Sequence, residues 1–178
     1  DVHTDYLGLD ITGLRHVITP TANYYFTHQP TVAKENLHQF DTIDAVDTAN
    51  GVLLALENKL QTKRLEGGAL KSVDLAAFIV STDYMFRLDK NNVDMKSQKF
   101  NGFDFQLEIA PYPWLYGLGK LHLDNKREVV ETESFDLVAH GGDKWSVGVG
   151  HRYENVSTGT DNFGTFDVVY KINEKWKA

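Results

Sequence analysis

Seven histidines are the residues of this chain best suited to metal binding or acid–base chemistry, and they are scattered along it. They are His3, His16, His28, His38, His122, His140 and His151. Metal sites place histidines and carboxylates together at short, characteristic spacings, and no two of the seven adopt such a close spacing with a carboxylate. The pattern favours histidines on a solvated surface or in a water-filled lumen.

Three aspartates at three-residue intervals, Asp41, Asp44 and Asp47, are the nearest approach to a calcium loop. The glycine and the terminal glutamate of that loop are missing, so the pattern does not support a calcium site. Aspartates in a polar connection commonly accept hydrogen bonds from their own backbone, which is the interpretation that we favour.

Two Gly-X-Gly tripeptides, at 117–119 and 148–150, are too short for a dinucleotide fingerprint, which needs a third glycine between a strand and a helix. Within strands, such glycines relieve crowding or allow bending. No serine has the flanking glycines of a nucleophile elbow. We therefore predict that the chain is not an enzyme and that it binds no cofactor.

Large apolar residues recur at every second position over stretches of about ten residues, the length that a tilted strand needs to cross a bilayer. In one stretch the apolar side has Trp145, Val147, Val149 and Tyr153, and the polar side has Ser146, Gly148, Gly150 and Arg152. The same alternation separates Phe103, Phe105, Leu107 and Ile109 from Asp104, Gln106 and Glu108. It also separates Phe166, Val168, Tyr170 and Ile172 from Thr165, Asp167 and Lys171. This pattern predicts the wall of a β-barrel.

The alternation and the turn residues together predict an all-β fold, an antiparallel transmembrane barrel segment of about eight meandering strands that forms one domain over 1–178. The predicted strands are 14–28, 51–62, 73–88, 100–110, 115–124, 131–140, 144–154 and 163–172. Residues 49–65 also show some helical spacing, but Gly51 is a poor residue near a helix start, and we predict a strand there.

Composition excludes several classes of protein. The 178 residues carry a formal charge of -7 and no basic run, which argues against nucleic acid as a partner. The absence of cysteine excludes disulfides and thiolate metal sites. No apolar run has the ~18 residues of a spanning helix, so a membrane crossing would use strands. The chain begins with Asp and no signal peptide precedes it, so we expect a mature form or an excerpt of a longer chain.

The predicted connections alternate between long and short. Residues 29–50, 89–99 and 155–162 are long and polar, whereas 111–114, 141–143 and 173–175 are tight turns. Outer-membrane barrels have short turns at the periplasmic rim and longer loops outside. Two connections depart from this rule, because 63–70 is long for a turn and 125–130 is short for an outer loop.

Trp114, Trp145 and Trp176 all lie beside predicted tight turns, as expected of an aromatic girdle at one membrane interface. The alternative is that each tryptophan covers one end of a soluble core. Alternation alone leaves the direction of the two faces open, because a soluble lipid-binding barrel turns its apolar side inward. If the polar side lines a hydrated lumen, its residues include Asp104, Gln106, Glu108, Arg152, Asp167 and Lys171.

Several motifs in the first third of the chain resemble a known family. They are the segment Leu-Arg-His-Val-Ile-Thr-Pro at 14–20, Phe-Asp-Thr-Ile-Asp at 40–44, Asn-Gly-Val at 50–52 and Asn-Lys-Leu-Gln-Thr-Lys-Arg at 58–64. In order and type they resemble the C-terminal barrel portion of the LptD family of outer-membrane lipopolysaccharide-assembly proteins. The residues that carry the resemblance include Arg15, His16, Pro20, Asp41 and Asp44.

The resemblance implies a place in the bacterial outer membrane and a role in inserting lipopolysaccharide into the outer leaflet. The implied partners are lipopolysaccharide, outer-membrane lipids, an LptE-like lipoprotein and the periplasmic Lpt bridge. A barrel of only eight strands is narrow, and its own side chains fill the interior. We therefore expect these strands to belong to a larger barrel. Two alternatives remain, a small self-contained outer-membrane barrel that acts as an anchor or scaffold and a soluble barrel that binds a hydrophobic ligand or carbohydrate.

Overall fold

The computed structural model describes residues 12–28, 49–86, 99–100, 102–156 and 159–172. Eight strands account for nearly all of them. The strands are β1 (Thr12–Thr27), β2 (Ala49–Glu66), β3 (Ala69–Met85), β4 (Phe103–Tyr112), β5 (Leu115–Asp124), β6 (Val129–Gly141), β7 (Trp145–Val156) and β8 (Gly159–Tyr170). The described part of the chain contains no helix long and apolar enough to cross a membrane.

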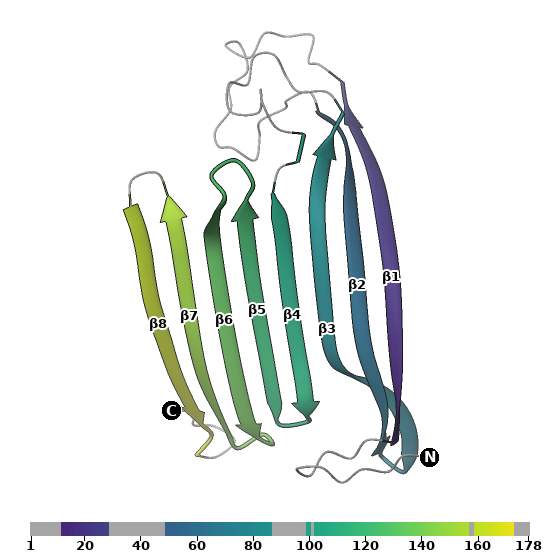
Figure 1. The fold of residues 1–178 in the computed structure, drawn as a ribbon. Helices are drawn as coiled ribbons and strands as arrows, with labels where there is room; N and C mark the ends of the chain where they lie inside the picture. Colours follow the sequence, from purple (N-terminus) through teal and green to yellow (C-terminus); the bar gives the residue numbers. More distant parts are fainter. Residues whose placement is uncertain (1–11, 29–48, 87–98, 101, 157–158, 173–178) are drawn as a thin grey trace.

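The strands form one antiparallel sheet in which each strand pairs with its neighbours in sequence, from β1 to β8 (Figure 1). β1 and β8 lie at opposite edges and do not pair with each other, so the sheet is an open meander rather than a closed barrel. The predicted all-β, antiparallel fold with about eight meandering strands is confirmed. The segment 49–65, for which a helix was the alternative, lies in β2.

Two predicted connections were wrong in length. Residues 63–70 are not a long connection, because β2 and β3 continue to a turn at Gly67 and Gly68, whose positive φ angles of 61° and 83° suit a two-residue type I′ hairpin. Residues 155–162 are not a long loop either, since β7 extends to Val156 and β8 begins at Gly159. With residues 63–70 now a tight hairpin, the segment no longer departs from the rule that one rim has short turns. The described connections at the lower rim in Figure 1 are all short.

The register divides the side chains between two faces across all eight strands, apart from register shifts near the strand ends between Thr12 and Arg15, Leu60 and Gln61, Ile109 and Tyr112, and His122 and Leu123. One row of register partners crosses the whole sheet and belongs to the mainly apolar face: His16, Leu60, Ala76, Ile109, Gly117, Leu137, Val149 and Phe166. The neighbouring row, one residue along each strand, belongs to the opposite face and includes Lys59, Glu108 and Asp136. Each strand therefore contributes alternate residues to each face, as pleating requires.

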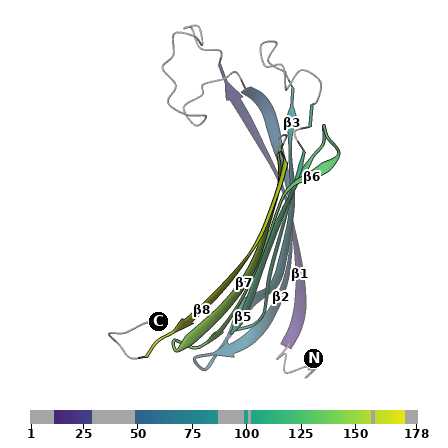
Figure 2. The same cartoon turned by 90° about the vertical axis from the view of Figure 1, so that its left-hand side faces the viewer.

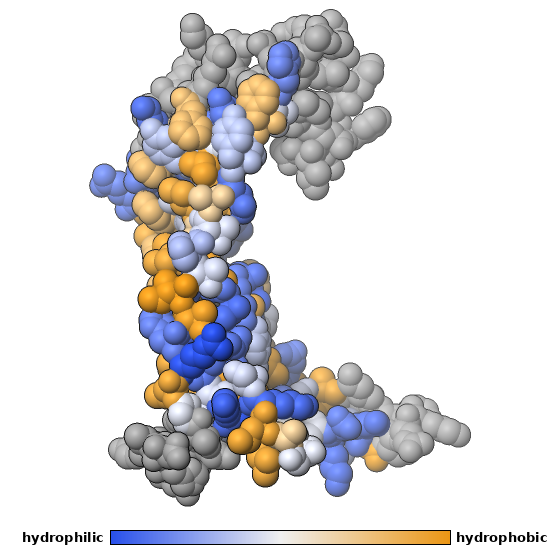
Figure 3. Space-filling model, turned by 90° about the vertical axis from the view of Figure 1, so that its right-hand side faces the viewer, coloured by the Kyte–Doolittle hydropathy of each residue, from blue (hydrophilic) through white to orange (hydrophobic). Residues whose placement is uncertain are grey.

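The sheet is bowed, and the two faces differ in curvature (Figure 2). Figure 3, which looks along the sheet from the β1 edge, shows hydrophobic side chains along the convex side and hydrophilic ones gathered toward the hollow. We name these the convex face and the concave face. The concave face is not uniformly polar, because it includes Leu53, Leu118 and Phe163.

The sheet is a single layer and has almost no core among the described residues. Leu75 and Ala77 are the only described hydrophobic residues that are buried. Large apolar side chains are instead open, among them Ile18 at 56%, Phe166 at 71% and Val168 at 54% exposure. A water-soluble monomer rarely leaves such a continuous apolar surface uncovered. The convex face therefore needs an apolar environment or a covering layer.

Candidate functional site

An apolar band runs over the convex face of all eight strands and is the most extensive surface feature of the described residues. Its residues include Ile18, Ala22, Tyr24 and Phe26 on β1; Val52, Leu54, Leu56 and Leu60 on β2; and Phe78, Val80 and Tyr84 on β3. It continues through Phe105, Leu107, Leu121, Phe135, Leu137, Val147, Val149, Phe166 and Val168. Asn58 on β2 and Thr82 on β3 interrupt it. Glu133 and His151, whose side chains lie 4.0 Å apart, are also on the convex face, where they border the band beside Phe135 on β6 and Val149 on β7.

The apolar band runs obliquely to the rows of register partners. On β1 the apolar stretch from Ile18 to Phe26 is centred on Ala22, six residues from His16 toward the long loops. On β8 the stretch from Phe166 to Tyr170 is centred on Val168, two residues from Phe166 toward the tight turns. His16 and Phe166 lie in the same row of register partners. Relative to that row, the centre of the apolar band shifts by about eight residues, or ~26 Å, between β1 and β8, across a sheet width of ~34 Å. The strands are therefore tilted by about 40° from the direction perpendicular to the apolar band. This angle is within the usual range of strand tilt in membrane barrels.

Aromatic rings collect at both ends of the sheet. At the loop end Tyr84 lies 5.4 Å from Phe86 and 5.0 Å from Phe100 between ring centroids, and Tyr24 lies 6.3 Å from Phe86. At the turn end the rings of Tyr112 and Trp114 stack at 5.1 Å. The turn-end tryptophans are predictable from their places beside tight turns, whereas the loop-end cluster consists of tyrosine and phenylalanine rings from separate segments and is not.

Trp145 and Trp114 lie at the tight-turn end, as predicted, and about half of each side chain is exposed. The Trp145 indole covers Gly141, its register partner, so closely that a Cβ at Gly141 would come within 2.0 Å of Nε1. A ring that covers a cross-strand glycine shields backbone that would otherwise be open. Trp176, Asp41 and Asp44 lie outside the described residues.

The predicted polar candidates share the concave face. Register places Asp104, Gln106 and Glu108 on the concave side of β4. Arg152 and Asp167 lie on the same side of β7 and β8, and Lys171 follows the end of β8. Among the family-motif residues, Arg15 lies on the concave face and His16 and Pro20 lie on the convex face. The structure therefore brings the polar candidates to one face but spreads them over several strands.

A polar network near the loop end of the concave face connects β4 to β7. The His122 Nδ1 atom lies 2.7 Å from Asp104 Oδ1, and its Nε2 atom lies 3.5 Å from Glu131 Oε2. Arg127 donates hydrogen bonds to Asp124 at 2.8 Å, to Glu131, and to the carbonyl of Asn155 at 3.2 Å. The hydrogen bond to Asp124, together with the charge of Glu131, raises the pKa of the Arg127 guanidinium. This network is not visible in the sequence, because its members come from four strands and the turn between β5 and β6.

Arg152 and Asp136 form a second polar group on the concave face. Arg152 Nη2 donates to both carboxylate oxygens of Asp136, at 2.7 and 3.0 Å, and its Nη1 donates to the Phe135 carbonyl at 3.1 Å. The carboxylate lies over Gly150, where a Cβ would come within 2.6 Å of Asp136 Oδ1. Gly150 therefore provides the space that this ion pair occupies.

We expect Asp136→Ala to destabilise the protein by only ~0–1 kcal/mol, because the Arg152–Asp136 pair is about one-third exposed and solvent screens it. Ser134→Ala on the same face of β6 is the control, and urea titration of both variants in detergent measures the difference. A loss of several kcal/mol would indicate that the concave face is closed off from water.

Among the described residues no group of three or more histidine, cysteine, aspartate or glutamate side chains is arranged to hold a metal ion. The two geometric features that stand out are instead extended surfaces. One is the oblique apolar band on the convex face, and the other is the charged concave face. Together they define an amphipathic, curved antiparallel meander of the kind that forms part of a barrel wall.

A comparison with known protein families, curated proteins and solved structures finds no match to this chain.

Proposed function

We propose that this chain forms part of the wall of a transmembrane β-barrel in a bacterial outer membrane. The oblique apolar band is the observation that carries the proposal. A membrane imposes an apolar zone perpendicular to the barrel axis, and strands inclined at ~35–45° then meet that zone obliquely. A soluble sheet that packs on a core has no reason to keep an apolar band at this angle on its convex side.

The dimensions of the band also fit a membrane. From Ile18 to Phe26 the apolar stretch of β1 covers eight residue steps, about 26 Å along the strand or ~20 Å along the normal at a 40° tilt. Outer-membrane barrels have an apolar band of ~25 Å with aromatic residues at both borders. The aromatic cluster near Tyr84 and the rings of Trp114 and Trp145 correspond to those two borders.

Within this class, we propose that the complete barrel inserts lipopolysaccharide into the outer leaflet. The proposal rests on the resemblance of 14–20, 40–44, 50–52 and 58–64 to the lipopolysaccharide-assembly family. The open edges at β1 and β8 support a barrel that contains further strands, since an open edge in lipid leaves backbone groups unpaired. They disfavour the self-contained eight-stranded anchor.

The proposed mechanism needs no covalent step. The sugar head of the amphiphile would pass along the hydrated concave face, where Asp104, Glu108 and Arg152 offer hydrogen bonds. The acyl chains would leave sideways into lipid, and each methylene transferred contributes ~0.8 kcal/mol. An LptE-like lipoprotein and the periplasmic Lpt bridge are the partners that this function would require.

Site-directed spin labels test the membrane orientation directly, because the chain has no cysteine and each introduced cysteine is labelled alone. Leu107→Cys lies on the convex face and Gln106→Cys is its neighbour on the concave face. In liposomes we expect oxygen to relax the label at 107 preferentially and a water-soluble nickel complex to relax the label at 106. The reverse pattern, or a monodisperse protein in buffer without detergent, would favour the soluble barrel instead.

Photo-crosslinking in cells tests the lipopolysaccharide role. In the full-length gene product, a photoreactive amino acid at Gln61 would face the concave side, and one at Leu60 would face the convex side near the turn end of the band. We expect lipopolysaccharide adducts at 61 and only phospholipid adducts at 60. Equal lipopolysaccharide labelling at both positions, or none at 61, would contradict passage along the concave face.

A further inference from the structure

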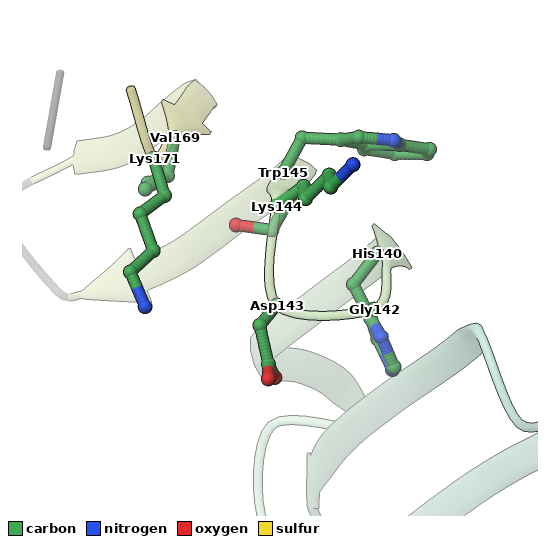
Figure 4. A pocket seen from close by; sticks show the side chains of 8 residues that line it. His140, Gly142, Asp143, Lys144, Trp145, Val169 and Lys171 are labelled. Atoms are coloured by element: carbon green, nitrogen blue, oxygen red, sulfur yellow. The ribbon is translucent and has the colours of Figure 1, made fainter. Parts of the chain in front are cut away.

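A charged notch lies at the tight-turn end of β6, β7 and β8 (Figure 4). Its volume is about 400 Å³, and it is lined by His140, Gly142, Asp143, Lys144, Trp145, Ser146, Val169 and Lys171. His140, Ser146 and Val169 belong to the concave face by register. We name this set the turn notch.

Backbone hydrogen bonds hold the turn notch in shape. The Lys144 N–H donates to the Gly141 carbonyl at 3.2 Å and closes the β6–β7 turn. Gly142 has a φ of 56°, a left-handed backbone conformation that favours glycine, in the three-residue connection between the paired residues Gly141 and Trp145. The Lys171 N–H donates to the Lys144 carbonyl at 2.8 Å, which fixes the end of β8 beside the turn. The backbone positions from which Asp143, Lys144 and Lys171 extend are thus fixed relative to one another.

The charged side chains of the notch form no ion pair with another described residue. Elsewhere on the concave face Lys59 pairs with Glu57, Arg127 with Asp124 and Arg152 with Asp136. No such pair within 4.0 Å involves the side chains of His140, Asp143, Lys144 or Lys171 among the described residues. Figure 4 shows the Asp143 carboxylate between Lys171 and His140, with all three extending to the same side, while Lys144 extends toward Trp145. Unpaired groups of both signs therefore face one space.

We propose that the turn notch binds a phosphoethanolamine group. Lys171 would donate to the phosphate, and the neighbouring Asp143 carboxylate would accept from the ammonium. The Asp143 carboxylate would repel a simple anion, and the lysine ammonium groups would repel a simple cation. A zwitterion with neighbouring opposite charges satisfies both. This binding goes beyond the proposed function and does not depend on lipopolysaccharide transport.

The ligand could be a soluble phosphoester or a lipid head group, and both carry the same recognised chemistry. Trp145 places the notch at the border of the apolar band, the level at which lipid head groups would lie. The notch is open to solvent, so we expect dissociation constants on the order of millimolar.

The test is a titration of the whole chain in detergent, followed by the NMR signal of the Trp145 indole N–H, which Trp145→Phe assigns. The probes are glycerophosphoethanolamine, glycerol 3-phosphate and inorganic phosphate. We expect saturable shifts with glycerophosphoethanolamine and about two- to fivefold weaker binding of the other two. Nanodiscs of phosphatidylethanolamine or phosphatidylglycerol then distinguish a lipid head group from a soluble ester.

Three variants make the test decisive. Lys171→Gln should weaken all phosphate probes, whereas Lys120→Gln, a lysine on the same face but outside the notch, should leave them unchanged. Asp143→Asn should abolish the preference for the ethanolamine ester. The proposal is overturned if no probe saturates, if both lysine variants lose binding equally, or if Asp143→Asn keeps the preference. None of these results depends on the membrane or transport proposals, so the binding proposal and the proposed function can fail independently of each other.

Discussion

Val147→Arg is expected to destabilise the protein in lipid by ~2–4 kcal/mol, the largest effect that we predict for a single substitution. Val147 lies on the convex face of β7, near the middle of the apolar band on that strand. A guanidinium there would have to enter hydrocarbon or distort the bilayer around it. Urea titration of the protein in lipid vesicles, followed by tryptophan fluorescence, measures the loss.

Val138→Arg is the matched control for this prediction. Val138 is the same residue type on the neighbouring strand and lies one row away on the concave face, where its register partner is Gly148. Since that face is proposed to meet water and carries Asp136 and Asp167, we expect a change close to zero. If Val138→Arg is the more damaging variant, the proposed orientation of the sheet is inverted.

Gly51→Ala is expected to cost ~1–3 kcal/mol, the second largest effect. A Cβ at Gly51 would lie 2.8 Å from the Tyr84 carbonyl oxygen and 2.6 Å from the Tyr25 hydroxyl. The tyrosine ring can move, but the carbonyl belongs to the β3 backbone, so relief requires the strands to shift. Equilibrium unfolding in detergent or lipid measures the loss.

Gly119→Ala controls for the general effect of removing a strand glycine. The nearest atom to a Cβ at that position is the Leu107 carbonyl oxygen at 4.0 Å, so the methyl group fits. Because glycine weakens a strand interior, we expect this variant to be neutral or slightly more stable. If both substitutions destabilise the protein equally, the close approach of the Tyr84 carbonyl to Gly51 is not the cause of the loss.

The fold was predictable because alternation and strand length agree along most of the chain. Phe103 to Ile109 alternate with Asp104 to Glu108, and the structure keeps these two sets on opposite faces. The ends of strands were less predictable. Residues 63–70 contain charged side chains typical of a loop, yet the two glycines at 67 and 68 permit a tight hairpin and the strands continue on both sides.

The direction of the faces and the polar contacts could not be obtained from sequence. Period two is the same whichever side is turned inward, and only the curvature of the sheet assigns Val149 to the convex side. The contacts of His122 with Asp104 and Glu131 depend on register between three strands. Their sequence separations carry no motif, so tertiary pairing alone brings them together.

The meander has a consequence for the order in which the sheet can assemble. β2–β3 and every consecutive pair from β4 to β8 are joined by only a few residues, whereas β1 and β2 are joined through 28–48 and β3 and β4 through 86–102. Closing a loop of about 20 residues costs ~2 kcal/mol more in chain entropy than closing one of two. Neighbouring strands that are joined by short connections are therefore the first able to pair. The sheet can then assemble by association of these preformed hairpins instead of by addition of single strands.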